Sequence, residues 1–218
     1  MGMGTSGRSR IAERAAKEIL PGMAVNLGIG IPSLVPDFLP RDFPVMIHAE
    51  NGILGIGPAP AKGMEDEDLC NAAGFPVTEA VNASYFDTSL AFGMIRGGHI
   101  DVTILGALEV SETGDLANWI VPGKKVPGIG GAMELALKAK KVIAVLSHSN
   151  KSGGSKLKAA CTLPLTAEGC VDLVITEKAV LKPGKDGFQL VEVLPPYTLE
   201  EVIRETEANI YTAGMKSQ

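Results

Sequence analysis

The chain has 218 residues and a formal net charge of −5, which disfavours a nucleic-acid-binding surface because such binding starts from clustered Lys and Arg. Hydrophobic residues make up 45% and charged residues 21%, which excludes a disordered chain and suits the core of one large domain. Glycine is unusual, since its 26 residues are about 12% of the chain against a typical ~7%. Many backbone positions therefore need positive φ or approach another group closely.

Cysteines and histidines show no metal-binding pattern. The three cysteines form no C-x-x-C and the three histidines form no H-E-x-x-H, so we expect neither a metal site nor a disulfide framework. The longest uncharged run, 19–36, contains Pro21, Pro32 and Pro36, which favours a buried strand and a loop over a membrane span. With no cationic and apolar leader before it, the expected compartment is the reducing cytoplasm.

The first half of the chain is predicted to contain one helix and three strands. Residues 9–20 form an amphipathic pattern, because Ile11, Ala15, Ala16 and Ile19 share one face. Strands are expected over 23–27, 45–48 and 100–105. The first two of these run into glycine-containing segments, and an acidic loop is expected over 63–68.

The second half alternates helix and strand more regularly. A helix is predicted over 132–140, opened by Gly130-Gly131 and with Met133, Leu135, Ala136 and Leu137 as its apolar set. Uninterrupted apolar runs at 142–146 and 171–176 are typical of parallel strands covered on both faces. Residues 188–193 alternate as an edge or antiparallel strand would. Thr198 and Glu201 form a capping box that begins a last helix, ending near residue 208.

This alternation predicts an α/β fold, an open and largely parallel sheet with flanking helices, in a single domain spanning 1–218. The ends, 1–7 and 211–218, are expected to be frayed. In such sheets ligands bind beyond the carboxyl ends of the strands. Three glycine clusters follow or precede these ends, at 28–30, 52–57 and 128–131, so we expect them to meet at one rim.

The glycine pairs do not fit a dinucleotide fingerprint. Gly28-Ile29-Gly30 lacks the third glycine of G-x-G-x-x-G and Pro32 interrupts the helix that should follow, while Gly55-Ile56-Gly57 runs directly into Pro58. The chain also has no G-x-x-x-x-G-K-[S/T]. Tight turns at strand ends are therefore favoured over nucleotide binding.

Glu50 is the candidate nucleophile. It ends an apolar strand and is the only charged residue in 50–58, where a carboxylate would be partly desolvated and more nucleophilic. The alternative is a solvated glutamate in a turn. Backbone N–H groups of the cluster at 128–133 could hold an anion or a developing oxyanion, and the alternative there is a simple turn into a helix.

Five segments in one order resemble the β subunit of the 3-oxoacid CoA-transferases, which include succinyl-CoA:3-oxoacid, acetoacetate and 3-oxoadipate CoA-transferases. The likeness covers about residues 8 to 208. The segments are VNLGIGIP at 25–32, ENGILGIGP at 50–58, MIRGGH at 94–99, GDLANW at 114–119 and GGAM at 130–133, joined by CTLPLT at 161–166.

The resemblance implies a mechanism and a partner. Glu50 matches the glutamate that carries CoA as a glutamyl-CoA thioester during ping-pong transfer between a short acyl-CoA and a 3-oxo or related carboxylic acid. Gly131, beside Gly130, matches the oxyanion-hole position, and Asn26 matches an asparagine near the glutamate. An α subunit would supply a second oxyanion donor, commonly in an α2β2 assembly. No metal or other cofactor is implied, because coenzyme A arrives as part of the substrate.

Two positions depart from the family pattern. Ala49 stands where the family usually has Ser, and Glu134 where it usually has Asp. Neither change removes a reacting group, but both bear on substrate preference. Two other functions remain open at this point: an α/β protein that binds a nucleotide or sugar phosphate through its glycine loops, and a non-catalytic binding subunit with a vestigial Glu50.

Overall fold

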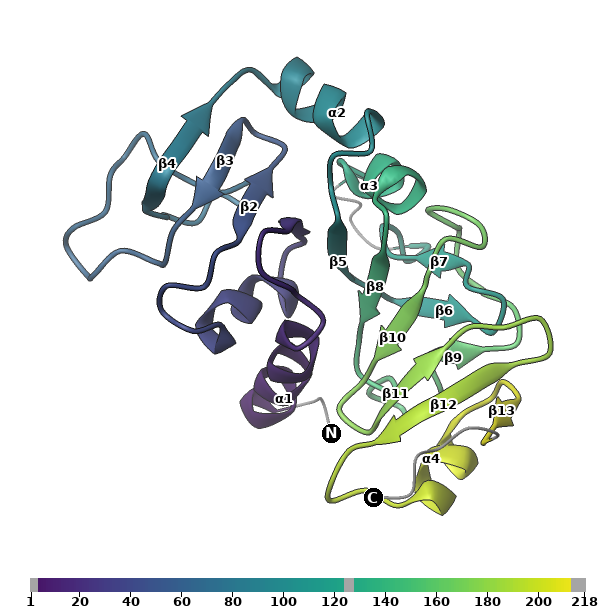
Figure 1. Cartoon of the computed structure of the whole chain (residues 1–218). Helices are drawn as coiled ribbons and strands as arrows, with labels where there is room; N and C mark the ends of the chain where they lie inside the picture. The colour runs from purple at the N-terminus through teal and green to yellow at the C-terminus, as the bar shows by residue number, and fades with distance from the viewer. Residues whose placement is uncertain (1–3, 124–127, 213–218) are drawn as a thin grey trace.

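A ten-stranded sheet forms the centre of the molecule (Figure 1) in a computed structural model that describes residues 4–123 and 128–212. In spatial order the strands are β13 (Ile210–Tyr211), β12 (Phe188–Val193), β11 (Ala179–Lys182), β10 (Leu173–Ile175), β8 (Val142–Val145), β5 (Val102–Gly106), β1 (Ala24–Leu27), β2 (Met46–Ala49), β3 (Ile53–Ile56) and β4 (Glu79–Tyr85).

The five strands β10, β8, β5, β1 and β2 run parallel, while the strands next to them on both sides turn back. Short connections force this reversal, because only an antiparallel neighbour can be reached through a tight turn. Accordingly β3 pairs antiparallel with β2, and β11 with β10. The predicted α/β class with a largely parallel sheet is confirmed.

Both faces of the sheet are covered. Helices α1 (Thr5–Ala16) and η1 (Pro32–Phe38) pack on one face. The other face carries α2 (Thr88–Arg96), α3 (Ala132–Lys138), α4 (Leu199–Glu205) and a small sheet of β7 (Leu116–Ala117), β6 (Glu109–Ser111) and β9 (Leu157–Lys158). Strand β8 is continuously apolar because it is buried on both faces. Ile143 and Val145 belong to the core on the first face, and Val142 and Ala144 belong to the core on the second.

Several predicted elements are confirmed with shifted ends. Ile11, Ala15, Ala16 and Ile19 are buried on one side as expected, but the first helix begins at Thr5 rather than at residue 9. Its first turn closes because the Gly7 and Arg8 amides donate to the Gly4 carbonyl. Residues 5–7 of the end expected to be frayed thus lie in the helix, and residues 1–3 lie outside the described part.

The other end of the described chain adds an edge strand to the sheet. Ile210 and Tyr211 form β13, which pairs in parallel with Phe188 and Gln189 of β12. Tyr211, the first residue of the segment expected to be frayed, thus belongs to the sheet, and residues 213–218 are outside the described part. By contrast, the capping box is present as predicted, with Thr198 Oγ1 accepting from the Glu201 amide at 3.2 Å.

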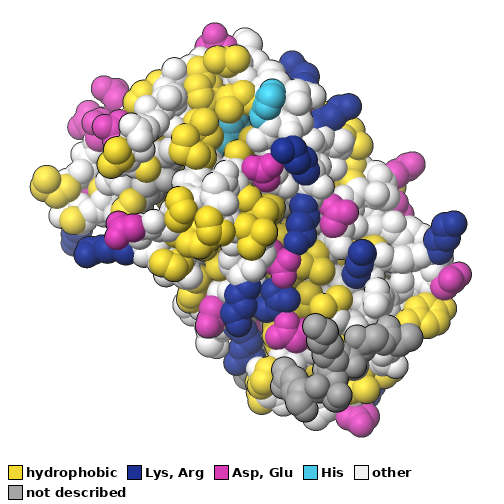
Figure 2. Space-filling view, viewed as in Figure 1, with side chains coloured by type: hydrophobic (Ala, Val, Ile, Leu, Met, Phe, Trp, Pro, Cys, Tyr) yellow, Lys and Arg dark blue, Asp and Glu magenta, His cyan; other side chains and the backbone are white. Residues whose placement is uncertain are grey.

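The surface view shows how side chains are distributed on one face of the molecule (Figure 2). Hydrophobic side chains gather over η1 and β2–β4, and charges of both signs are interspersed along the middle. None of the helices in residues 4–123 and 128–212 has the length and apolar character required to cross a membrane. Over the same residues, no three His, Cys, Asp or Glu side chains are grouped to hold a metal ion. All three cysteines are free thiols.

Candidate active site

Glu50 occupies the tight turn between β2 and β3, at the carboxyl end of β2. The turn is closed by a hydrogen bond from the Gly52 amide to the Ala49 carbonyl, 3.1 Å long. The hydroxyl of Thr88, the first residue of α2, donates to the Glu50 carbonyl at 2.8 Å. The half-buried Glu50 side chain is thus carried by a backbone that is fixed from both sides.

Asn26 lies beside Glu50 on the neighbouring strand β1. The Asn26 side chain is 1% exposed, and its Nδ2 lies 3.2 Å from Glu50 Oε2. The same nitrogen lies 3.2 Å from the carbonyl oxygen of His48 and 3.3 Å from His48 Nδ1. These acceptors fix the Asn26 amide with its donor side toward the carboxylate.

His48 forms the buried support of this contact. It is 1% exposed, lies in register with Asn26 on β2, and its ring stacks on Phe86 with centroids 6.3 Å apart. Burial lowers the pKa of His48, and the negative charge of Glu50 opposes that shift only in part. A neutral imidazole can accept at Nδ1, which suits the Asn26 donor.

Gly131 also lies close to Glu50. It is the N-cap of α3, and a Cβ built on it would lie 3.5 Å from both Cγ and Cδ of Glu50 and 3.3 Å from the Phe92 ring. No acceptor within residues 4–123 and 128–212 pairs with the Gly131 amide. Gly130, at φ 56°, has no neighbour within 4 Å of a Cβ and provides the left-handed turn into α3. The structure therefore brings Asn26, Glu50 and Gly131 together.

The Cβ positions of the glycines that follow Glu50 face another part of the sheet. A Cβ on Gly52 would lie 2.1 Å from the Phe86 carbonyl oxygen, one on Gly55 3.0 Å from Ala83 Cα, and one on Gly57 2.6 Å from Thr78 Oγ1. All three contacts are to β4 or the residues beside it. Close packing of β3 against β4 therefore accounts for these three glycines, and the part of this cluster in a shared rim stays a prediction.

Helix α2 belongs to the site, although the sequence analysis predicts no helix over these residues. Its signals are present: Asp87 caps it by accepting from the Leu90 amide at 2.9 Å, and Gly97-Gly98 follows its last residue. Arg96 in its last turn forms a two-pronged ion pair with Glu134 of α3, with nitrogen–oxygen distances of 2.7 and 2.9 Å. The Arg96 guanidinium also lies 5.7 Å from the centroid of the Phe92 ring.

Two hollows lie away from Glu50. One of about 900 Å³ is bounded by η1, β2 and the segment before β4, and Leu34, Phe43 and Phe75 contribute to its wall. Another of about 470 Å³ lies between the start of α1 and the carboxyl ends of β8 and β10. The elements that hold Glu50 instead present exposed apolar side chains, namely Ile29 after β1, Leu90 on α2, and Met133 and Leu137 on α3.

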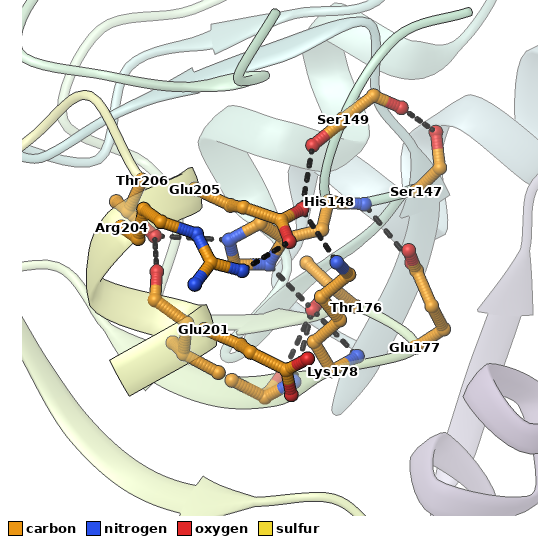
Figure 3. A network of polar contacts seen from close by, with 12 residues as sticks. Ser147, His148, Ser149, Thr176, Glu177, Lys178, Glu201, Arg204, Glu205 and Thr206 are labelled. Atoms are coloured by element: carbon orange, nitrogen blue, oxygen red, sulfur yellow. Dashed lines mark hydrogen bonds and ion pairs between the residues drawn. The ribbon is translucent and has the colours of Figure 1, made fainter. Parts of the chain in front are cut away.

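A second polar network adjoins the smaller hollow (Figure 3). His148, fully buried, lies between two hydroxyls, with Nδ1 3.1 Å from Thr176 Oγ1 and Nε2 2.9 Å from Thr206 Oγ1. Glu205 pairs with Lys178 beside it. Burial, together with the Lys178 charge, lowers the pKa of His148 to about 4. The network shares no residue with the set around Glu50 and ties α4 to the sheet.

Comparison with known proteins decides the family. The coenzyme A transferase family model matches residues 8–205. The chain belongs to the coenzyme A transferase family. It is 64% identical over 210 residues to the β subunit of a probable coenzyme A transferase from Bacillus subtilis, covering 96% of this chain and 97% of that protein.

More distant relatives agree with this membership. The chain is 48% identical over 201 residues to a subunit of the succinyl-CoA:3-ketoacid coenzyme A transferase of Helicobacter pylori (strain 26695), covering 92% of this chain and 97% of that one. The structure of an acyl-CoA transferase from Escherichia coli O157:H7 superposes with a TM-score of 0.77 at 21% identity, over 97% of this chain and 43% of that one, which shows the shared fold. The resemblance found in the sequence motifs is confirmed at the level of the family.

Proposed function

We propose that this chain is the β subunit of a CoA-transferase that moves CoA between a short acyl-CoA and a 3-oxo or related carboxylic acid, with Glu50 as the nucleophile. The observation that carries the proposal is the position of the Glu50 carboxylate, 3.2 Å from the Asn26 amide and next to Gly131. The resemblance implies a nucleophile at Glu50 and an oxyanion donor at Gly131, with Asn26 near the glutamate. The names of the relatives favour acyl-CoA and 3-ketoacid substrates.

The chemistry is double acyl transfer through Glu50. A carboxylate oxygen of Glu50 attacks the thioester carbonyl, the carbon–sulfur bond breaks, and CoA thiolate leaves a mixed anhydride on Glu50. The thiolate then attacks the glutamyl carbonyl, which releases the donor's carboxylate and leaves a glutamyl-CoA thioester. The acceptor acid runs both steps in reverse. Each step exchanges one nucleophile for another, so coenzyme A enters only as substrate.

Asn26 and Gly131 have separate roles in this scheme. Asn26 donates to Glu50 Oε2 and so orients the carboxylate with its other oxygen toward the thioester. Gly131, whose Cβ position lies 3.5 Å from Glu50 Cδ, donates its amide to the oxyanion that forms when that carboxyl carbon or the substrate carbonyl becomes tetrahedral. A preorganised donor of this kind is worth roughly 2.7–4 kcal/mol of transition-state stabilisation.

A partner α subunit completes the site in this proposal, in an α2β2 assembly. Ile29 is 66% exposed, Leu90 54% and Leu137 55%, on the elements that hold Glu50. Apolar side chains grouped in this way mark protein contact surfaces. The relatives that are themselves named as subunits of larger enzymes support the same division of labour.

The test is to trap the intermediate on the assembled enzyme. The chain is purified with its partner subunit, incubated with acyl-CoA and treated with borohydride, which reduces a glutamyl thioester. Mass spectrometry of the peptide containing Glu50 should show the change there, and Glu50→Gln should abolish both the adduct and the transfer of CoA. Glu168→Gln, at an exposed carboxylate with no partner around Glu50, is the matched control and should behave as wild type.

Two outcomes would contradict the proposal. Full transferase activity in Glu50→Gln would show that Glu50 is not the nucleophile. Tight binding of a nucleotide or sugar phosphate that is indifferent to Glu50, without any CoA transfer, would favour the binding-protein alternative instead.

A further inference from the structure

We infer that helix α2 sets the distance between Glu50 and the Gly131 amide, and that Thr88, Arg96 and Glu134 are positioning residues for the transfer reaction. The inference rests on the proposed function, because it assigns a task to residues around the proposed nucleophile and oxyanion donor. It is carried by contacts along the whole length of α2. These contacts join the turn that carries Glu50 to the helix that begins after Gly131.

The start of α2 holds the nucleophile's backbone. Thr88 Oγ1 donates to the Glu50 carbonyl at 2.8 Å, one turn before the helix reaches Phe92. A side chain at Gly52 would collide with the Phe86 carbonyl oxygen. Because glycine has none, the hairpin turn that carries Glu50 packs directly against the segment that leads into α2. The hairpin and the start of α2 therefore move as one body.

The middle of α2 contacts Gly131. The Phe92 ring lies 3.3 Å from the Cβ position of Gly131, which in turn lies 3.5 Å from Glu50 Cδ. A ring at this distance limits how closely the start of α3 can approach α2 and the Glu50 side chain. Phe92 is thus the spacer that separates α2 from the start of α3.

The end of α2 fixes the orientation of α3. Arg96 donates from two nitrogens to both oxygens of Glu134, at 2.7 and 2.9 Å, and Glu134 is the third residue of α3. A forked guanidinium–carboxylate pair constrains angle as well as distance. The pair lies over Phe92, since the guanidinium is 5.7 Å from that ring's centroid. Glu134, a departure from the family pattern, therefore has a physical role.

Because the Arg96–Glu134 ion pair is partly exposed, its effect on catalysis can be distinguished from an effect on the stability of the fold. The Arg96 and Glu134 side chains are 59% and 30% exposed, and ion pairs at such sites contribute little to folding. Transfer, however, needs reacting atoms placed within a fraction of an ångström, and a small displacement costs rate steeply. Loss of the pair is therefore expected to slow catalysis while leaving the fold intact.

The experiment is a double-mutant cycle on the assembled enzyme, with Arg96→Ala, Glu134→Ala and the combination. We expect each single variant to reduce the rate of adduct formation on Glu50 by about tenfold, with KM for acyl-CoA and melting temperature near wild type, and the double variant to lose no more than either single one. Glu134→Asp should recover part of the rate and Arg96→Lys less, since lysine cannot form the fork. Thr88→Ser should retain the rate that Thr88→Val loses.

Lys158 and Glu207 provide the matched control. They form an ion pair between β9 and the segment after α4, remote in sequence from every residue of the site, and Lys158→Ala should leave the rate unchanged. Wild-type rates in the Arg96 and Glu134 variants, or equal losses from Lys158→Ala, would overturn the inference. Failure of the wild-type enzyme to form any adduct on Glu50 would instead defeat the proposed function.

Discussion

Glycine serves two different purposes around Glu50. Gly131 is a place where a side chain would crowd the Glu50 carboxyl group, and no backbone acceptor in the described residues pairs with its amide. Gly52, Gly55 and Gly57 are places where a side chain would collide with β4 or its neighbours. The excess of glycine in the composition therefore reflects strand pairing as much as chemistry.

Gly52→Ala should be strongly destabilising. At φ 121° and with a Cβ 2.1 Å from the Phe86 carbonyl oxygen, the variant must distort both the hairpin turn and the segment that follows β4. We expect a loss of at least about 2 kcal/mol in the free energy of unfolding, measured by urea denaturation. Gly93→Ala is the control, because Gly93 lies in α2 with open space around it and should gain about 0.5–1 kcal/mol. Equal effects would refute this account of Gly52.

His148 should make stability depend on pH. Its folded-state pKa of about 4 lies below the ordinary 6.5, so in acid the unfolded chain takes up a proton that the folded chain refuses. Stability is therefore lost as the pH falls from about 6.5 to about 4, by up to about 3 kcal/mol. Because His148→Gln lacks this group, the advantage of wild type over the variant in unfolding free energy should shrink over that window. A difference that stays constant with pH would contradict the assignment.

Helix ends differ in how far local sequence defines them. The capping box at Thr198 and Glu201 is local, involves residues three apart, and is formed as predicted. The start of α1 has no side-chain cap, and its first turn extends four residues beyond the amphipathic pattern. Boundaries are thus predictable where a side chain closes the helix and uncertain where only the backbone does.

Thr198→Ala tests the cap of α4. Loss of the hydroxyl that accepts from the Glu201 amide should cost about 1 kcal/mol of unfolding free energy. Thr198→Ser retains that oxygen and should remain close to wild type. Thermal melting of the two variants side by side gives the comparison, and an alanine variant as stable as the serine variant would show that the cap contributes nothing.

At the scale of the whole molecule, helix α3 buries only part of its apolar side chains. Of the four apolar side chains predicted to line it, Leu135 and Ala136 are in the core, while Met133 and Leu137 are 42% and 55% exposed. They share one face, four residues apart, on the helix that starts at Gly131. This face is what the proposed partner subunit would cover.

Leu137→Ser should weaken assembly with the partner by about fivefold or more, since a buried leucine at an interface contributes on the order of 1 kcal/mol or more. Ile203→Ser is the control, because Ile203 is 47% exposed on α4, which carries none of the residues around Glu50. Dissociation constants from titrations of the two subunits provide the measurement. Equal weakening by both variants would mean that the exposed face of α3 is not the contact surface.

The sequence by itself determined the fold class, the family and the three residues that meet at the site. Continuous apolar runs require a sheet covered on both faces, and parallel strands bring their carboxyl ends to one rim, so Asn26 and Glu50 had to lie close together. These are consequences of local pattern and of strand direction, which a single chain can reveal.

Only the tertiary structure decided what surrounds these residues. That His48 lies behind Asn26, that Gly52 contacts Phe86, and that Arg96 reaches Glu134 follow from strand register and helix docking. The last pair is separated by 38 positions in the sequence. No local pattern encodes such contacts, because they arise when many weak packing preferences are satisfied together. The sequence thus placed the candidate site residues, and the packing of α2 against α3 fixed what surrounds them.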